Sequence, residues 1–484
     1  MASAEHKAVD MGWGMRMVAI DNALRPVEPL LVLACASFYA GGGWGSFKLA
    51  ESMAYLLFRL SLLGLDRGIV WRFGHSEPVE YRRDLFASLA WVLGASLIGS
   101  IALIGLSFTA VGSVKGMDLP LVSLLMIAAS IPLLAGAEML FQANLNHQEM
   151  LARILGKNVV MPLVTFGGAA LSHFLHGPGL PFWFFLGTLA NGVVAIVAFL
   201  RTHGISRSDL KPSKPSRDLL NFSFPLIGSD LLAGVTSRMD LMLLGGLAGI
   251  KAVEVYNVVM MIGRSLNAIR SSFEGLLLSA FSREGNKVLT SLLRIRLNHA
   301  VWAVGNLMGL ALLVIVFWGQ NLLSLLNPQY QEGWTALIAM TFLTWLNVSG
   351  DLSGLMLQGL GRSRDWMSAQ VAGFVVNLAF NLWWIPLWGA LGGVLALGAS
   401  VFAQGLVCQL LLWRSIEGHI WIGRYLRSSL HFGSGLVALC AISLFLDNIW
   451  LRSALFAFAS ASWVFLYRKG SADFGRDLVP ATQA

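Results

Sequence analysis

The sequence predicts an all-α protein embedded in a membrane, with about fourteen transmembrane helices arranged as two six-helix lobes and a C-terminal helix pair. Of the 484 residues, 56% are hydrophobic and only 12% are charged, and average soluble domains carry about twice that share of charge. Apolar stretches of about 20 residues, the length that crosses a bilayer, recur along the chain. Short alternating strands are not predicted, which excludes a membrane β-barrel. The composition also excludes a soluble enzyme, a disulfide-stabilised secreted domain and a disordered chain.

We expect one helix in each apolar stretch. The predicted spans are 13–39, 47–71, 84–110, 118–142, 150–173, 178–200, 218–246, 252–281, 298–325, 332–358, 365–385, 388–413, 427–446 and 449–467. The first span carries Asp21, Arg25 and Glu28 and is followed by no small-residue cleavage site, so we interpret it as a retained helix. Pro26 and Pro29 each remove a backbone hydrogen bond, which predicts a bend in this helix.

The connections between the spans alternate in charge. One set is basic, such as RFGHSEPVEYRR at 72–83, whereas the other set is nearly uncharged, such as HGPGLP at 176–181. Cytoplasmic loops of membrane proteins carry an excess of Lys and Arg, so we expect both termini and the basic connections in the cytoplasm. The net charge of +8 is scattered over these connections. It therefore indicates topology, and no nucleic-acid partner is expected.

The longest connection, 201–217, contains Lys-Pro-Ser twice in succession and is predicted to be an extended linker. It separates the sixth predicted span from the seventh. We therefore expect an N-terminal lobe at 1–210, a C-terminal lobe at 211–416, and two extra helices with a cytoplasmic tail at 417–484.

The two lobes resemble an old duplication. Gln142 corresponds to Gln358, and Phe47 corresponds to Tyr256, at similar offsets along the chain. Each lobe has an even number of predicted spans, so a repeat would give both lobes the same orientation. That arrangement is typical of transporters whose halves rock against each other.

Several segments resemble the multidrug/oligosaccharidyl-lipid/polysaccharide (MOP) flippase superfamily. The strongest is the turn NLAFNLWWIPLWGALGG at 377–393, which matches the pattern N-x3-N-x3-IP-x2-G-x2-GA except that Gly393 replaces the final Ala. The segment at 237–259 resembles the turn between the seventh and eighth helices of that superfamily. The motif residues are Asn377, Asn381, Ile385, Pro386, Gly389 and Gly392 in the first segment, and Arg238, Asp240, Gly245 and Tyr256 in the second.

Within this superfamily the chain is most similar to the polysaccharide and O-antigen flippases of the Wzx type. The resemblance implies a non-enzymatic flippase in the bacterial cytoplasmic (inner) membrane. It would move an undecaprenyl-diphosphate-linked oligosaccharide from the cytoplasmic to the periplasmic leaflet by alternating access, for O-antigen or exopolysaccharide synthesis. Its expected partners are that glycan, membrane lipids, and the polysaccharide polymerase or export machinery.

Three alternatives remain open at this point. One is a lipid II flippase of the MurJ type, and another is a drug or cation antiporter of the MATE type. The third, a glycan ligase or polymerase, would need a large outer loop with catalytic groups, and the outer connections predicted here are short. Enzyme motifs such as GxSxG, Walker A and HExxH are not found in a suitable context.

Charged residues inside predicted spans gather in the first, second, seventh and eighth helices. Such residues are costly in a bilayer and are expected to face the interior of the protein. Arginines would bind the diphosphate, because a guanidinium can donate two parallel hydrogen bonds to a phosphate. Acids would hold these arginines in the empty site, and one acid would bind a coupling proton or sodium ion. The arginines are Arg25, Arg59, Arg238, Arg264 and Arg270; the acids are Asp21, Glu28, Asp230, Asp240 and Glu274; further polar residues are Tyr55, Asn257, Asn267 and Ser271.

The alternative interpretation of these charges is that they form buried ion pairs that fix helix register, such as Arg270 with Glu274. Glu138 and Asp351 are interpreted as structural polar contacts. No metal or cofactor is expected, because the three cysteines lie in apolar stretches without CxxC spacing. His173 and His176 are interpreted as part of a surface turn.

Overall fold

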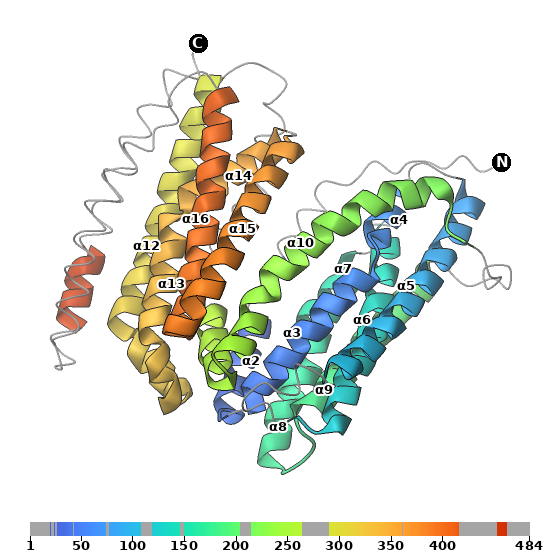
Figure 1. Cartoon of the computed structure of the whole chain (residues 1–484), viewed down its shortest axis with the longest axis horizontal. Coiled ribbons are helices and arrows are strands. Elements are labelled where there is room, and N and C mark those ends of the chain that lie inside the picture. The colour runs from blue at the N-terminus through green and yellow to red at the C-terminus, as the bar shows by residue number, and fades with distance from the viewer. Residues whose placement is uncertain are drawn as a thin grey trace. The chain divides into compact units, whose positions relative to one another are not determined.

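The computed structural model describes most of the chain, and every regular element in that part is a helix (Figure 1). The predicted all-α membrane class is therefore confirmed. Seven helices in the described part are long and apolar enough to cross a membrane, and the total of fourteen stays a prediction. The described residues are 20, 24, 27–41, 43–73, 77–107, 119–145, 150–203, 214–263, 290–360, 362–415 and 453–461.

The chain divides into two compact units, residues 1–254 and 255–484. The lobe boundaries expected from the sequence, at 210 and 416, stay predictions. In the first unit, α7, η1, η2 and α8 follow one another as a single span. The elements of the first unit are α2 (Val27–Phe38), α3 (Gly43–Ser61), α4 (Leu65–Phe73), α5 (Pro78–Ser107), α6 (Leu121–Leu145), α7 (Met150–Leu155), the π-helices η1 (Gly156–Val160) and η2 (Leu163–Gly167), α8 (Gly168–Phe174), α9 (Leu180–Thr202) and α10 (Arg217–Leu247).

The second predicted span, 47–71, is two helices in the structure. α3 ends at Ser61 and α4 begins at Leu65, with a turn between them in which Leu63 and Gly64 have φ of 53° and 66°. Positive φ values are incompatible with a continuous right-handed helix. The hydrophobic pattern does not reveal this break, because the turn residues are themselves apolar.

The core of the first unit is aromatic where α3, η2 and α9 meet. Trp44 contacts Phe47 and Phe166 with ring centroids 6.2 and 6.4 Å apart, and Phe47 contacts Phe184 edge-on at 5.6 Å. Offset and edge-on ring contacts of this kind add to the stabilisation from buried apolar area. This core holds the N-terminal part of α3 against η2 and α9.

The second unit contains the remaining helices. The predicted tenth span, 332–358, is divided at Asn347 into α13 and α14. Buried residues of α12, α13, α14 and α16 form one apolar core, to which Ala459 also belongs. The motif residues Asn377 and Asn381 are buried in α15 and hydrogen-bonded to each other. The elements of this unit are α12 (Thr290–Leu326), the 3₁₀-helix η3 (Pro328–Gly333), α13 (Trp334–Leu346), α14 (Val348–Gly359), α15 (Ser363–Trp388) and α16 (Ala390–Ser415), with further helical residues at 255–263 and 453–461.

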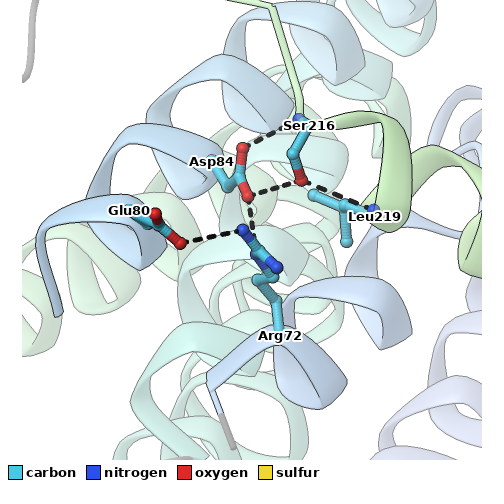
Figure 2. A network of polar contacts seen from close by, with 5 residues as sticks. All are labelled: Arg72, Glu80, Asp84, Ser216 and Leu219. Atoms are coloured by element: carbon cyan, nitrogen blue, oxygen red, sulfur yellow. Dashed lines mark hydrogen bonds and ion pairs between the residues drawn. The ribbon is translucent and has the colours of Figure 1, made fainter. Parts of the chain in front are cut away.

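The start of α10 is fastened to α4 and α5 by a polar network, which we call the Asp84 clasp (Figure 2). The Asp84 carboxylate accepts hydrogen bonds from the backbone nitrogen of Ser216 at 2.8 Å, from Ser216 Oγ at 2.7 Å and from Arg72 Nε at 2.8 Å. Ser216 in turn caps α10, because its Oγ accepts from the backbone nitrogen of Leu219 at 3.4 Å. The clasp therefore joins the end of the proline-containing linker to α4 and α5 within the first unit.

The turn before α3 is held by Glu254, a residue that the sequence did not single out. Its buried carboxylate accepts hydrogen bonds from the backbone nitrogens of Gly41 at 3.3 Å and Gly45 at 3.1 Å. Backbone N–H groups at a helix start have no partner within the helix, and a carboxylate satisfies them well. The GGGWG stretch therefore contacts the first turns of the helix that begins at Ile250.

We expect Gly45→Ala to destabilise the protein by about 1–3 kcal/mol, the usual range for overpacking. A Cβ on Gly45 would lie 2.6 Å from Glu254 Cγ and 2.8 Å from the backbone oxygen of Ile250, and that backbone cannot move aside freely. Gly43→Ala is the matched control, since no heavy atom lies within 4 Å of a Cβ built there. The midpoint of thermal unfolding in detergent measures the stability of both variants. Equal midpoints for the two variants would contradict the close packing at Gly45.

Candidate functional site

Two of the predicted arginines meet at one tyrosine in the first unit. α10 lies along α3 (Figure 1), which brings Arg238 of α10 to Tyr55 of α3. Arg238 Cζ is 4.4 Å from the centroid of the Tyr55 ring. Arg59, one turn along α3, donates hydrogen bonds from Nε and Nη2 to Tyr55 Oη at 3.3 and 3.2 Å. We call these three residues the Tyr55 cluster.

Local geometry explains this arrangement. Tyr55 and Arg59 are four residues apart and therefore share a face of α3. Gly234 of α10 faces them, because a Cβ built on it would lie 3.7 Å from Arg59 Cβ. That separation is an ordinary van der Waals contact, so α10 packs directly on α3 at the level of Arg59. The Tyr55 ring face then attracts the Arg238 guanidinium through the ring quadrupole.

The charge of the Tyr55 cluster is not neutralised by an ion pair within the described part of the chain. Among the residues that the structure describes, no carboxylate lies within ion-pair distance of Arg59 or Arg238. Glu138 and Asp66 interact with Arg59 only through longer-range electrostatics. Two half-buried guanidinium groups that share one neutral phenol repel each other. An anion between them would remove this repulsion and accept their remaining N–H groups.

The structure describes only some of the other predicted site residues. Glu28 is exposed in α2 and Asp240 is buried in α10, and both have interaction partners. Asn257 is buried in the second unit, and for Asp230 only the backbone position in α10 is described. The rest lie outside the described residues: Asp21, Arg25, Arg264, Asn267, Arg270, Ser271 and Glu274.

Three further ion pairs in the first unit involve cations that were not among the predicted site residues. Lys48 of α3 has its Nζ 2.7 Å from Glu51 Oε2, and 5.0 and 5.1 Å from the centroids of the Trp44 and Phe166 rings. Glu138 of α6, interpreted as a structural contact, pairs with Arg153 and Lys157. A buried acid in an apolar helix is the signal that would have directed a search for these cations.

The described residues give no indication of a metal or cofactor site. No group of three or more His, Cys, Asp and Glu residues that could hold a metal ion occurs among them. His173 stacks on Phe38 with ring centroids 5.3 Å apart, as expected for a packed surface turn. Cys35 donates from Sγ to the backbone oxygen of Phe166 at 3.0 Å, and Cys408 is buried.

No protein-family model matches the chain, and no curated protein matches it. Solved structures do. A structure described as the lipid II flippase MurJ in an inward closed conformation aligns with a TM-score of 0.74 and 15% identity, over 95% of this chain and 100% of that one. An inward-facing MATE-family multidrug transporter of the MOP superfamily aligns with a TM-score of 0.66 and 13% identity, over 83% and 97%. A MOP-superfamily transporter from Pyrococcus furiosus aligns with a TM-score of 0.53 and 14% identity, over 82% and 93%.

The chain has the fold of MOP-superfamily transporters. It is thus a multi-pass membrane protein, as the sequence predicted. The identities of 13–15% show the fold alone. The Wzx-type branch expected from the sequence motifs stays a prediction, as do the roles of the site residues.

Proposed function

We propose that the protein is a flippase for a polyprenyl-diphosphate-linked oligosaccharide, most similar to the Wzx type. It moves the headgroup from the cytoplasmic to the periplasmic leaflet by alternating access. The observation that carries this proposal is the Tyr55 cluster, in which two half-buried arginines share one phenol and have no carboxylate in ion-pair range among the described residues. Such a pair suits a diphosphate, which offers several anionic oxygens to guanidinium groups.

The fold supports a lipid-linked substrate. The structure described as a lipid II flippase aligns over 95% of this chain. Arg25, Arg264 and Arg270 are proposed to extend the cationic surface of the Tyr55 cluster. Acids, Asp240 and Glu28 among them, would hold arginines in the empty site, and one acid would take the coupling proton or sodium ion. We place the protein in the bacterial cytoplasmic membrane, with both termini in the cytoplasm and the polysaccharide polymerase or export machinery as partners.

The charge of the Tyr55 cluster argues against a drug or cation antiporter, since Arg59 and Arg238 would repel a cationic substrate. The Pyrococcus furiosus transporter is described as one whose reversed pocket polarity suggests a different function. A change of charge within this fold is therefore a sensible basis for assigning substrate class. A lipid II flippase would share the anionic headgroup, and the mass of the substrate separates that alternative.

The experiment that tests the proposal uses cells that lack this protein. Lipid-linked saccharides are extracted, their masses are measured, and their leaflet is assigned by accessibility to an impermeant reagent. We expect polyprenyl-diphosphate-linked saccharide to accumulate on the cytoplasmic face, together with loss of a surface polysaccharide. An accumulated peptide-bearing saccharide would instead identify a lipid II flippase. No accumulation, with new sensitivity to cationic dyes, would identify a drug antiporter.

A further inference from the structure

A second group of cations lies in the first unit around Glu138. The Glu138 carboxylate receives Lys157 Nζ at Oε2 in an ion pair, and Arg153 Nη2 lies 3.5 Å from Oε1. Gln142, one turn further along α6, donates from Nε2 to Oε1 at 3.0 Å. We call Glu138, Arg153 and Lys157 the Glu138 cluster. It connects α6 with the span that begins at Met150.

The Glu138 cluster has one negative charge for two positive charges. Among the described residues, Glu138 is the only carboxylate in ion-pair range of Arg153 or Lys157. The acid side chain is 4% exposed, whereas those of Arg153 and Lys157 are 30% and 32% exposed. An arginine has five N–H donors and a lysine three, so most of their donor capacity is left over. The cations can therefore contact a further anion while the acid stays buried.

The backbone around Lys157 is also unusual. Lys157 lies in η1, and a second π-helical stretch, η2, follows three residues later in the same span. Short π-helical stretches inside α-helices are rare and occur often at functional sites. Here Lys157 of η1 forms the ion pair with Glu138 of α6.

The Glu138 cluster is electrostatically connected to the Tyr55 cluster, because Glu138 acts on the Arg59 guanidinium. Arg153 and Lys157 thus share one acid, Glu138, in ion-pair range among the described residues, and that acid also acts on Arg59. This is an excess of positive charge within a membrane-embedded unit.

We propose that Arg153 and Lys157 form a second anion-binding subsite, in which Glu138 holds the position that an anionic group of the transported headgroup takes over. The ligand is an oxyanion, either a phosphate of the lipid diphosphate or the carboxylate of an acidic sugar. This inference rests on the proposed function and extends it from the Tyr55 cluster to a second point of contact. It assigns Glu138 the role of a competitor that releases the cations when substrate arrives and takes them back when it leaves.

The competitor role predicts that substitutions of Glu138 and of the two cations change anion affinity in opposite directions. Removal of the Glu138 charge by Glu138→Gln should tighten anion binding about threefold or more, because the cations then lack their resident acid. Lys157→Gln and Arg153→Gln should each weaken binding about tenfold or more, since hydrogen bonds between charged groups are the strong ones. A structural ion pair predicts that removing either partner acts in the same direction.

The test measures binding of two probes to the purified full-length protein by calorimetric titration. Farnesyl diphosphate carries the diphosphate without a glycan, and glucuronate carries a sugar carboxylate without phosphate. Opposite shifts for Glu138→Gln and Lys157→Gln with farnesyl diphosphate support a phosphate subsite, and the same pattern with glucuronate supports a sugar-acid subsite. Arg201→Gln, at the exposed end of α9, is the matched control and should leave both affinities unchanged.

Failure of the inference can be separated from failure of the proposed function. If Arg59→Gln with Arg238→Gln abolishes farnesyl diphosphate binding while the Glu138 and Lys157 variants match wild type, only the second subsite is refuted. If wild-type protein binds neither probe, both proposals are refuted. Should Glu138→Gln not fold, Glu138→Asp withdraws the carboxylate and is expected to tighten binding as well. Weaker binding by that variant would overturn the competitor role.

Discussion

Replacing both Arg59 and Arg238 by glutamine is expected to lower export of the lipid-linked saccharide by about 100-fold, because each arginine would donate charged hydrogen bonds to the diphosphate. The two guanidinium groups are held at Tyr55, one by hydrogen bonds of 3.2 and 3.3 Å and one over the ring at 4.4 Å. Surface polysaccharide and cytoplasmic-face accumulation in complemented cells measure the effect. Tyr55→Phe keeps the ring beneath Arg238 but removes the hydroxyl acceptor of Arg59, so its effect should be smaller.

The same double variant should leave thermal stability unchanged or raise it. In the empty protein the two guanidinium groups repel each other, and glutamine removes that repulsion. Lost activity with retained stability is the pattern of a site that is built for a ligand. Wild-type export by a folded double variant would refute the diphosphate assignment. Lost stability together with lost export would instead favour the ion-pair interpretation of these arginines.

Asp84→Asn is expected to lower the free energy of unfolding by about 3 kcal/mol, the low end of the range for breaking a buried ion pair. Arg72 and Asp84 side chains are 10% and 4% exposed, so the arginine would remain buried with a weaker partner in the exposed Glu80. The amide would also replace a charged acceptor for Ser216 by a neutral one (Figure 2). Denaturation in mixed detergent micelles measures the change.

Two control variants accompany that prediction. Glu80→Gln removes an exposed carboxylate 3.3 Å from Arg72 and should change stability by less than about 1 kcal/mol. Ser216→Ala removes the cap of α10 and should cost about 1 kcal/mol. If Asp84→Asn were no more destabilising than Glu80→Gln, the clasp would not be what fastens α10.

The sequence predicts helices well here because bilayer spans have a simple physical requirement, about 20 apolar residues. It does not predict the turn at Leu63 and Gly64, whose residues are apolar, or the division at Asn347, where polar residues are interpreted as part of one span. Hydropathy reports the free energy of transferring side chains from water, and it is insensitive to backbone dihedral angles. Interruptions that are themselves apolar are therefore invisible to it.

The candidate site was partly predictable for the same reason. Tyr55 and Arg59 share a helix face by spacing alone, and Arg238 was recognised as a charge within a span. Their meeting at one ring depends on how α10 packs on α3, which spacing does not encode. Glu254 was missed because it follows a connection with little charge and makes contacts 209 and 213 residues away in sequence. Arg153 and Lys157 were missed because the candidate charges were sought in the first, second, seventh and eighth spans, whereas these two lie in the fifth.

The Asp84 clasp has a consequence for the order of assembly during synthesis. Asp84 and Ser216 are 132 residues apart, and the linker between α9 and α10 lies between them. The clasp therefore cannot close until the ribosome has released the segment beyond the linker. Until then Arg72 and Asp84 lack the Ser216 contacts, and the faces of α3 and α4 that receive α10 are uncovered. The first unit is thus completed by the seventh predicted span, and a nascent chain that stops at the linker would expose a polar surface to quality-control proteases.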